Sequence, residues 1–217
     1  MLNAEFAINR KAMVDSQLRT SGVVEPWLIA AMGAVPRERF VPDGSGDIAY
    51  MDRQISLGSR RMMNPPMATG LMLQQVQVKP DDHILVVGGA TGYSVCLLAG
   101  RAKSVILLEM EDSLVDAAKA NLSALDNISV VSGILPDGWE ADAPYSLIII
   151  DGAIEILPQA IADQLADGGR VVTGLTEKGV GRIAMGIKHG DAIALRSFVD
   201  CSVAVLPVFE QAAEFVF

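Results

Sequence analysis

Short apolar runs recur through the middle of the chain, and each is long enough for one buried strand. We expect strands at residues 84–87, 104–109, 128–132, 146–151 and 170–174. The segments after the first, second and fourth of these runs have the spacing of helices. Nearly continuous apolar strands that alternate with helices are typical of a parallel sheet covered on both faces. The pattern therefore predicts an α/β fold.

The part of the chain before this region has a different pattern. Helical spacing dominates the first 35 residues, where Pro26 opens a helix that Pro36 ends. Residues 37–66 are irregular and rich in Gly, Pro and Asp, and a third helix is expected from Met67 to about Val76. We therefore predict an N-terminal helical extension with an active-site loop over residues 1–80.

The pattern changes again after Gly174. Antiparallel strands are expected there, at residues 183–187, 192–206 and 213–217. A dinucleotide-binding dehydrogenase would normally build a second set of βαβ units, so this ending favours a methyltransferase-like sheet. Residues 81–217 are predicted to form this α/β domain, in one compact unit with the extension.

A glycine turn follows the first strand, and an acid ends the second. The turn reads Gly88-Gly-Ala-Thr-Gly92, and Gly88 lies 21 positions before Glu109. At this spacing a nucleotide-binding βαβ unit places a carboxylate beside a ribose diol, which indicates an adenosine derivative as the ligand. The alternative, which the spacing disfavours, is an exposed acid at a strand end. A strict glycine fingerprint would have glycine at position 90, where this chain has Ala90.

Composition and charge narrow the class of partner. The 217 residues are half apolar and one-fifth charged, which is typical of a folded globular domain. A net charge of -9 disfavours nucleic acid, because such binding depends on Lys and Arg that neutralise phosphates. Residues 83–100 contain no Asp, Glu, Lys or Arg, but the glycines in their middle favour a strand and a helix over a membrane span. With charged residues near the N-terminus in place of a signal peptide, we expect a cytoplasmic protein that does not bind membranes.

The sequence gives little support to metal or thiol chemistry. Cys96 and Cys201 lack the spacing of metal ligands and are expected to be buried thiols. The two histidines, His83 and His189, are too few for most zinc sites or histidine-based catalysis. No metal site is predicted.

Several segments together resemble the protein-L-isoaspartate O-methyltransferases. They lie in the first helix, before the central domain, in the glycine loop and around the fourth strand: Met13–Leu18, Val35–Pro42, Ala49-Tyr50, Leu57-Gly58, Gly92-Tyr93, Asp142–Tyr145 and Gln164–Arg170. The run Pro36-Arg-Glu-Arg-Phe-Val-Pro42 is the most specific, because many methyltransferases share the glycine loop.

The resemblance implies a Rossmann-like S-adenosylmethionine-dependent methyltransferase fold, with a mostly parallel sheet and antiparallel C-terminal strands. It implies methyl transfer from S-adenosyl-L-methionine to the carboxylate of isoaspartyl residues in damaged peptides and proteins. The expected cofactor-binding residues are Gly88, Gly89, Ala90, Gly92, Glu109, Met110, Gly133 and Ile134. Asn64 is the expected catalytic residue, in the position where the family has a serine near the transferred methyl group.

Four departures from the family pattern fall in this pocket. Val86 replaces an acid before the turn, Ala90 a glycine, Ile134 an acid that faces adenine, and Asn64 the serine. Ala90 is costly only if its φ is positive. Ile134 loses one hydrogen bond, worth about 1 kcal/mol. The Asn64 amide can still donate to a substrate carboxylate.

The roles of Asp151, Arg60 and Arg61 stay open at this point. Asp151 follows the fourth strand and could bind substrate or a metal, although a helix cap or loop acid is favoured. Arg60 and Arg61 either grip an anionic substrate or are solvated loop charges, and Asn64 is either a substrate contact or a turn residue. The alternatives to isoaspartyl methylation are a methyltransferase-fold binding protein that has lost catalysis and an enzyme that methylates another small acceptor. The oligomeric state stays open as well.

Overall fold

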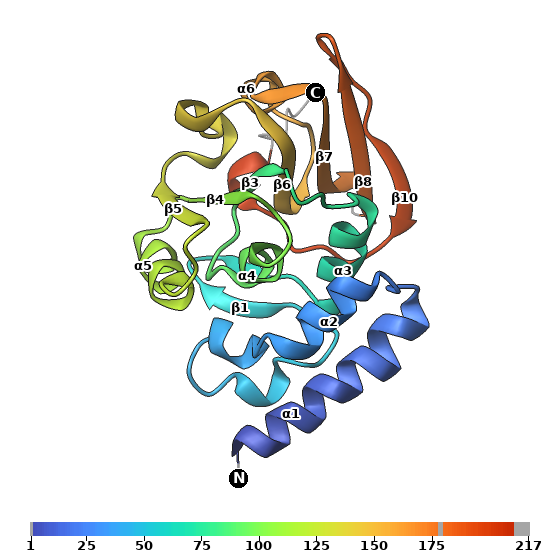
Figure 1. Cartoon of the computed structure of the whole chain (residues 1–217), viewed down its shortest axis with the longest axis vertical. Helices are drawn as coiled ribbons and strands as arrows, with labels where there is room; N and C mark the ends of the chain where they lie inside the picture. The colour runs from blue at the N-terminus through green and yellow to red at the C-terminus, as the bar shows by residue number, and fades with distance from the viewer. Residues whose placement is uncertain (1, 178–179, 211–217) are drawn as a thin grey trace, which may run out of the picture.

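A mostly parallel sheet forms the centre of the computed structural model (Figure 1), which describes residues 2–177 and 180–210. The strand order is β10-β8-β7-β6-β3-β4-β5, with a short β9 beside β8. The strands are β3 (His83–Val87), β4 (Ser104–Glu109), β5 (Ile128–Ser132), β6 (Tyr145–Ile154), β7 (Leu165–Glu177), β8 (Val180–His189), β9 (Ala192–Ile193) and β10 (Arg196–Asp200). Strands β3 to β7 pair in parallel, whereas β8, β9 and β10 pair antiparallel. The predicted fold class is confirmed.

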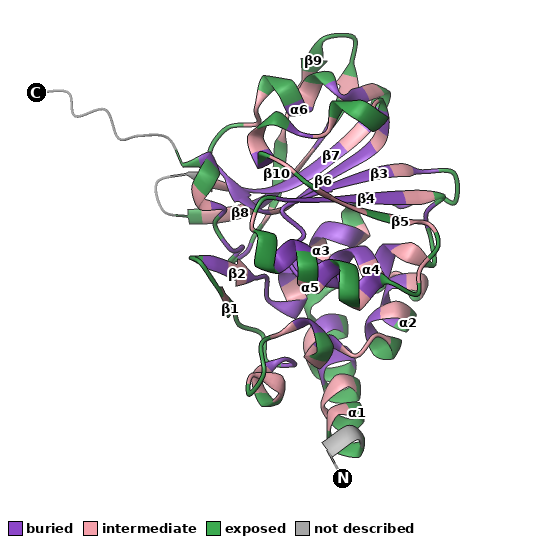
Figure 2. Cartoon of the chain, turned by 90° about the vertical axis from the view of Figure 1, so that its left-hand side faces the viewer, coloured by how far each residue is buried: buried purple, intermediate pink, exposed green. Residues whose placement is uncertain are grey.

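Both faces of this sheet are buried, which explains why its strands are nearly continuous in apolar residues. Ile84 and Val86 of β3 pack into a core on the side of α3 (Pro66–Gln75), α4 (Tyr93–Ala99) and α5 (Asp112–Leu122). Leu85 and Val87 point to the other side, where the short α6 (Gln159–Asp163) supplies Ile161. Figure 2 shows α3, α4 and α5 on one side of the sheet and α6 on the other.

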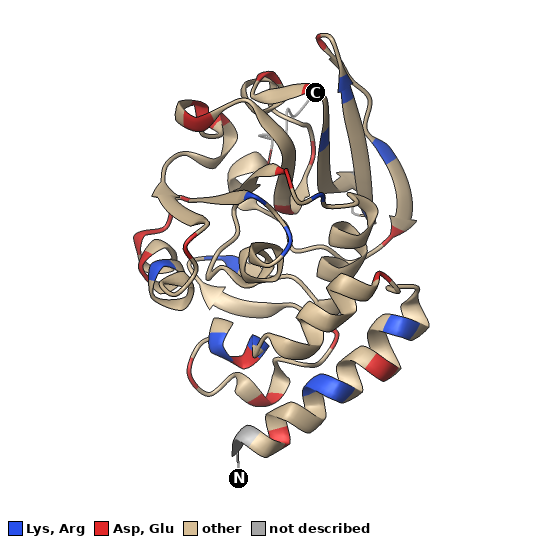
Figure 3. Cartoon of the chain, in the orientation of Figure 1, with Lys and Arg blue, Asp and Glu red and all other residues tan. Residues whose placement is uncertain are grey.

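The N-terminal segment is helical, as predicted. It consists of α1 (Leu2–Ala12), a π-helical continuation (Met13–Leu18) and α2 (Pro26–Ala34). Charged residues of both signs lie along α1 and its continuation (Figure 3), where Asp15 pairs with Lys11 and Arg19. The opposite face of the segment buries Met13 and Leu18 in the core.

The region expected to be irregular contains a separate two-stranded sheet. Strands β1 (Ile55–Gly58) and β2 (Arg61–Met63) pair antiparallel, and Ser59 and Arg60 form the turn between them. The alternation is too short to distinguish this hairpin from a loop in the sequence. It brings Arg61 and Asn64 to the carboxyl ends of β3, β4 and β6.

The strand expected at residues 192–206 is wrong as one element. Only β9 and β10 form there. Cys201 N still donates to Gly181 O of β8 at 3.1 Å, and residues 204–206 then lie beside the end of β6. Their backbone groups bond elsewhere, since Ala204 O accepts from Ala153 N at 2.7 Å and Leu206 N donates to Ala153 O at 3.0 Å. The strand expected at residues 213–217 lies outside the described residues. Cys201 is buried as expected, whereas Cys96 is only partly buried.

Within the described ranges, no helix is long and apolar enough to cross a membrane.

Candidate functional site

The glycine turn connects β3 to α4 in a left-handed backbone conformation. Gly88, Ala90 and Gly92 have φ of +72°, +50° and +94°. A Cβ at Gly92 would lie 2.7 Å from Leu122 Cδ1, so a side chain has no room there. Ala90 meets the condition under which the departure from glycine is costly, and its left-handed φ is unfavourable by about 1–2 kcal/mol.

Glu109 ends β4 directly beside this turn, as its spacing predicted. Its side chain is fully buried, so the reading of an exposed strand-end acid is wrong. Its carboxylate accepts hydrogen bonds from Ala90 N at 3.0 Å and from Met110 N at 2.8 Å. The ribose-binding acid of the sequence prediction is therefore already held by the backbone around it.

Arg61 completes the surroundings of this carboxylate. Its Nη1 lies 2.5 Å from Glu109 Oε1, and its Nη2 donates to Gly88 O at 2.9 Å. Both side chains of the ion pair are almost fully buried, with exposures of 5% for Arg61 and 0% for Glu109. The Arg61 Nε is also buried and has no hydrogen-bond partner within residues 2–177 and 180–210. Neither sequence reading of Arg61, as a substrate grip or as a solvated charge, describes this position.

Arg60 lies next in the chain but in a different environment. Its side chain is exposed, and its Nη2 is 3.7 Å from Glu210 Oε2. This matches the reading of Arg60 as a solvated loop charge.

Asn64 and Asp151 face each other on the other side of the turn. Asn64 Nδ2 donates to Asp151 Oδ1 at 2.8 Å, and Ser94 Oγ donates to Asp151 Oδ2 at 2.6 Å. Asn64 Oδ1 accepts from Ala204 N at 2.7 Å. Burial raises the pKa of Asp151, and the hydrogen bonds from Ser94 and Asn64 oppose this effect. The site therefore holds a buried acid whose neutral form is favoured relative to water.

Asp151 is neither a helix cap nor a loop acid, because β6 continues three residues beyond it to Ile154. Among the described side chains, no group of three His, Cys, Asp or Glu could hold a metal ion.

Arg37 contacts Asn64 and was not singled out as a site residue in the sequence. It is fully buried, and it donates to Ala49 O at 2.7 Å and to Asn64 O at 2.5 Å. Its guanidinium lies 4.6 Å from the Tyr93 ring centroid, within the range of a cation–π contact. Arg37 lies in the run Pro36–Pro42, the most specific family segment, and this run could have indicated it as a site residue.

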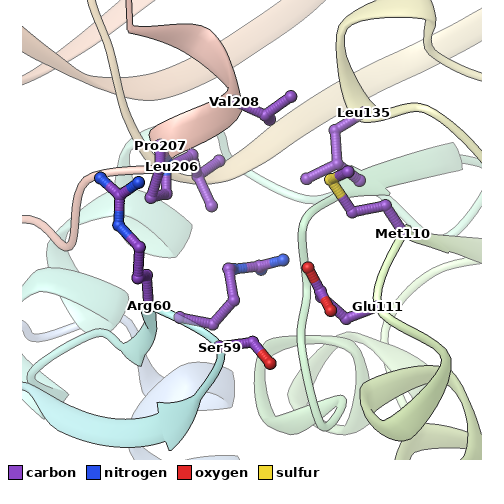
Figure 4. Close-up of a pocket in the computed structure, with 9 residues that line it drawn as sticks. Ser59, Arg60, Met110, Glu111, Leu135, Leu206, Pro207 and Val208 are labelled. Carbon is purple, nitrogen blue, oxygen red and sulfur yellow. The ribbon is translucent and has the colours of Figure 1, made fainter.

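Two cavities flank the turn. The inner one has a volume of only about 10 Å³ and is lined by residues that include Asn64, Gly88, Ala90 and Asp151. The outer pocket measures about 320 Å³. Its lining consists of Ser59, Arg60, Arg61, Met110, Glu111, Leu135, Leu206, Pro207 and Val208. In Figure 4, Met110 and Leu135 line one side and Leu206 and Pro207 the side across from them.

Four of the eight predicted cofactor residues line one of these two cavities. Gly88, Gly89 and Ala90 line the inner cavity, whereas Met110 lines the outer pocket. Ile134 is 58% exposed and does not line either cavity, although its neighbour Leu135 lines the outer one. A Cβ at Gly133 would contact Leu108 at 3.1 Å, so this glycine packs against β4. The structure thus places two of the residues that depart from the family pattern. Ile134 is largely exposed to solvent, and Val86 is buried in the core.

Leu206 was not predicted, and no local signal indicates it. Its Cδ1 and Cδ2 would both lie 3.2 Å from a Cβ at Gly88, and the same side chain closes over Gly152. Leu206 and Arg61 both line the outer pocket.

Comparisons with known proteins agree on one family. The model of the protein-L-isoaspartate(D-aspartate) O-methyltransferase family matches residues 8–211. Protein-L-isoaspartate O-methyltransferase 1 of Rhodopseudomonas palustris is 36% identical over 169 residues, which cover 77% of this chain and 69% of the relative. A Methanoculleus marisnigri protein-L-isoaspartate O-methyltransferase is 33% identical over 75% of each chain.

Solved structures agree on the fold. One protein-L-isoaspartate O-methyltransferase superposes with a TM-score of 0.78 at 20% identity, over 91% of this chain and 65% of the other. A putative member from Plasmodium falciparum, in complex with S-adenosyl-L-homocysteine, superposes with a TM-score of 0.76 at 19% identity, over 91% of this chain and 97% of the other.

Proposed function

The chain belongs to the protein-L-isoaspartate(D-aspartate) O-methyltransferase family, and we propose that it methylates the carboxylate of isoaspartyl residues in damaged proteins with S-adenosylmethionine as donor. The observation that carries this proposal is the extent of the family match, over residues 8–211. It includes the glycine turn and Glu109, and also the N-terminal segment that brings Asn64 to them.

The chemistry requires few catalytic groups from the protein. When bound, the cofactor supplies an electrophilic methyl group. A carboxylate acceptor is already ionised at neutral pH, so the chain contributes alignment and a site that excludes water rather than a general base. We assign alignment of the acceptor carboxylate to the Asn64 side-chain amide. Ala204 N donates to its oxygen, and Arg37 donates to the backbone carbonyl of Asn64.

Asp151 restricts how such an acceptor can approach. An ionised Asp151 would repel a second carboxylate, whereas the neutral acid could donate a hydrogen bond to it. The raised pKa of Asp151 supports the neutral form in this role. The same buried acid would also suit a neutral acceptor, which keeps methylation of another small molecule as an outcome to be tested.

The site as it stands does not fit the cofactor. Arg61 forms an ion pair with Glu109 and donates a hydrogen bond to the Gly88 carbonyl. The inner cavity of about 10 Å³ holds no more than about one water molecule. The cofactor contacts of Gly88, Gly89, Ala90, Gly92, Glu109, Met110, Gly133 and Ile134 therefore stay predictions.

A second candidate function follows from the same ion pair. If Arg61 never leaves Glu109, the chain is a methyltransferase-fold binding protein without catalysis. Titration with S-adenosylhomocysteine separates the two functions, since no binding at millimolar ligand would favour the second.

Methyl transfer to peptides tests the leading function directly. Tritium from labelled S-adenosylmethionine should appear in an isoaspartyl peptide and not in the aspartyl peptide of the same sequence. Absence of transfer to the isoaspartyl peptide at saturating cofactor would refute the activity, and transfer to both peptides would refute the specificity.

The remaining partner and location predictions rest on the sequence. We propose a cytoplasmic protein whose partners are isoaspartyl proteins. The net charge of -9 supports the exclusion of nucleic acid.

A further inference from the structure

We propose that Arg61 is a latch that closes the cofactor site, and that the β1–β2 hairpin must withdraw it before an S-adenosyl ligand can bind. The inference rests on the proposed function for the class of ligand, but its tests measure binding and not methyl transfer.

The latch takes the acceptors that a ribose diol would use. Glu109 Oε1 accepts from Arg61 Nη1 and Met110 N, and Oε2 accepts from Ala90 N. A carboxylate has about four lone-pair positions, and here the guanidinium covers its open side. Two ribose hydroxyls can donate to Glu109 only after Arg61 has left.

The latch also divides the space that the ligand needs. An S-adenosyl ligand combines a nucleoside with an amino-acid tail, so it must extend through a continuous cleft. Arg61 lines the outer pocket and bonds to Gly88 O, and Gly88 lines the inner cavity. A Cβ built at Gly88 would meet both Leu206 at 3.2 Å and Arg61 Nη2 at 3.4 Å, so these two side chains lie beside Gly88. The lining of the outer pocket includes no residue of the glycine turn, so a ligand confined to this pocket would not reach the turn.

The hairpin that carries Arg61 is well suited to move. Strands β1 and β2 pair with each other and form a sheet separate from the central one. Ser59 and Arg60 at their turn both have left-handed backbone, with φ of +46° and +60°, at positions where Asn-Gly is preferred. Both residues are exposed, and the contact of Arg60 with Glu210 is a partly solvated ion pair at 3.7 Å.

The closed state also contains unfavourable terms that opening would relieve. The Arg61 Nε is buried and finds no acceptor among the described residues, which costs the desolvation of a donor. Burial of both charges of the ion pair opposes their attraction. The latch is therefore held mainly by two hydrogen bonds, from the guanidinium to Glu109 Oε1 and to Gly88 O, and a ligand that offers donors to the same acceptors could replace them.

Calorimetric titration with S-adenosylhomocysteine tests the latch. Arg61→Gln keeps a donor for Glu109 but removes the ion pair, so it should lower the Kd at least tenfold relative to wild type. Arg61→Lys retains the charge without the forked geometry and should fall between the two. Arg53→Ala removes an exposed charge two residues before β1 and should leave the Kd unchanged.

Thermal unfolding of each variant shows whether it is folded before the titration. A folded Arg61→Gln protein that binds no more tightly than wild type, or that does not bind at all, overturns the latch.

Chemical modification gives a second readout that does not depend on a variant. Phenylglyoxal, an arginine reagent, should spare Arg61 in the free wild-type protein and modify it in the presence of saturating S-adenosylhomocysteine, as read by peptide mass spectrometry. Equal modification with and without ligand, or protection of Arg61 while the ligand is bound, contradicts the proposal. If both tests succeed and isoaspartyl methylation fails, the latch stands and the proposed function falls.

Discussion

Replacing Gly92 by alanine tests the geometry of the turn that the candidate site is built on. Gly92 immediately precedes α4 with φ of +94°, a region that an L side chain avoids. The added methyl group would meet Leu122 Cδ1 at 2.7 Å and Leu122 Cγ at 3.1 Å. Leu122 is itself 3% exposed, so its side chain can move away only by displacing its neighbours in the core.

Two costs combine in this variant. The left-handed conformation costs about 1–2 kcal/mol for a residue with a Cβ. Overpacking against a buried leucine costs about 1–3 kcal/mol. We therefore expect Gly92→Ala to lower the free energy of unfolding by about 2–5 kcal/mol, which for a chain of this size lowers the Tm by about 4–20 °C.

Gly100→Ala is the matched control. Gly100 follows the same helix with φ of -78°, and a Cβ there meets nothing within 4 Å. Its replacement should be neutral or stabilise the fold by about 0.4–1 kcal/mol, through the unfolded chain. Urea unfolding and thermal melts followed by circular dichroism measure both variants. The reasoning is refuted if Gly92→Ala is within about 0.5 kcal/mol of wild type, or if the two substitutions destabilise equally.

Three further substitutions test the rest of the site. Burial raises the pKa of Asp151 in the folded protein, so the wild type loses stability as the pH rises from the ordinary aspartate pKa through this raised pKa. Asp151→Asn removes the ionisable group and should therefore stabilise the fold at pH 7. In thermal melts, the advantage of the variant should shrink as the pH is lowered towards about 4, and an advantage that is constant with pH would contradict the pKa shift. Arg37→Met leaves the carbonyls of Ala49 and Asn64 without their donor and should cost about 2–4 kcal/mol in urea unfolding, whereas no change would show that these contacts are dispensable. Asn64→Ala should lower kcat/KM for an isoaspartyl peptide at least tenfold, and unchanged turnover would remove Asn64 from the catalytic role.

Much of the central fold could be predicted because its signals are local. The strands β3, β4 and β5 were expected within one residue of their observed bounds. For β3 and β4 the reason is that both faces of the sheet are buried, so that their runs are nearly continuous in apolar residues. Residues 201–206 were expected to continue a strand because their alternation is the same as that of a strand. Their hydrogen bonds to Ala153 and Asn64 decide otherwise, and such bonds have no trace in a local pattern.

The candidate site was predictable in part for the same reason. Gly88 and Glu109 belong to one βαβ unit, so the number of residues between them determines that the carboxylate reaches the turn. Asn64 was named through the family pattern, but its partner Asp151 was not paired with it, because 87 positions separate the two residues.

By itself, the sequence determined the strand, glycine turn, helix, strand and acid, because these depend on side-chain period and on spacing along a short piece of chain. It also determined the family, through segments distributed from the first helix to β7. Only the tertiary structure decided what faces Glu109. Arg61 lies 48 positions away, on a hairpin whose own sequence is compatible with a loop, and the pairing of two buried charges depends on where that hairpin packs. The acid that the sequence assigned to a ligand is thus bound, in this conformation, by an arginine of the chain itself.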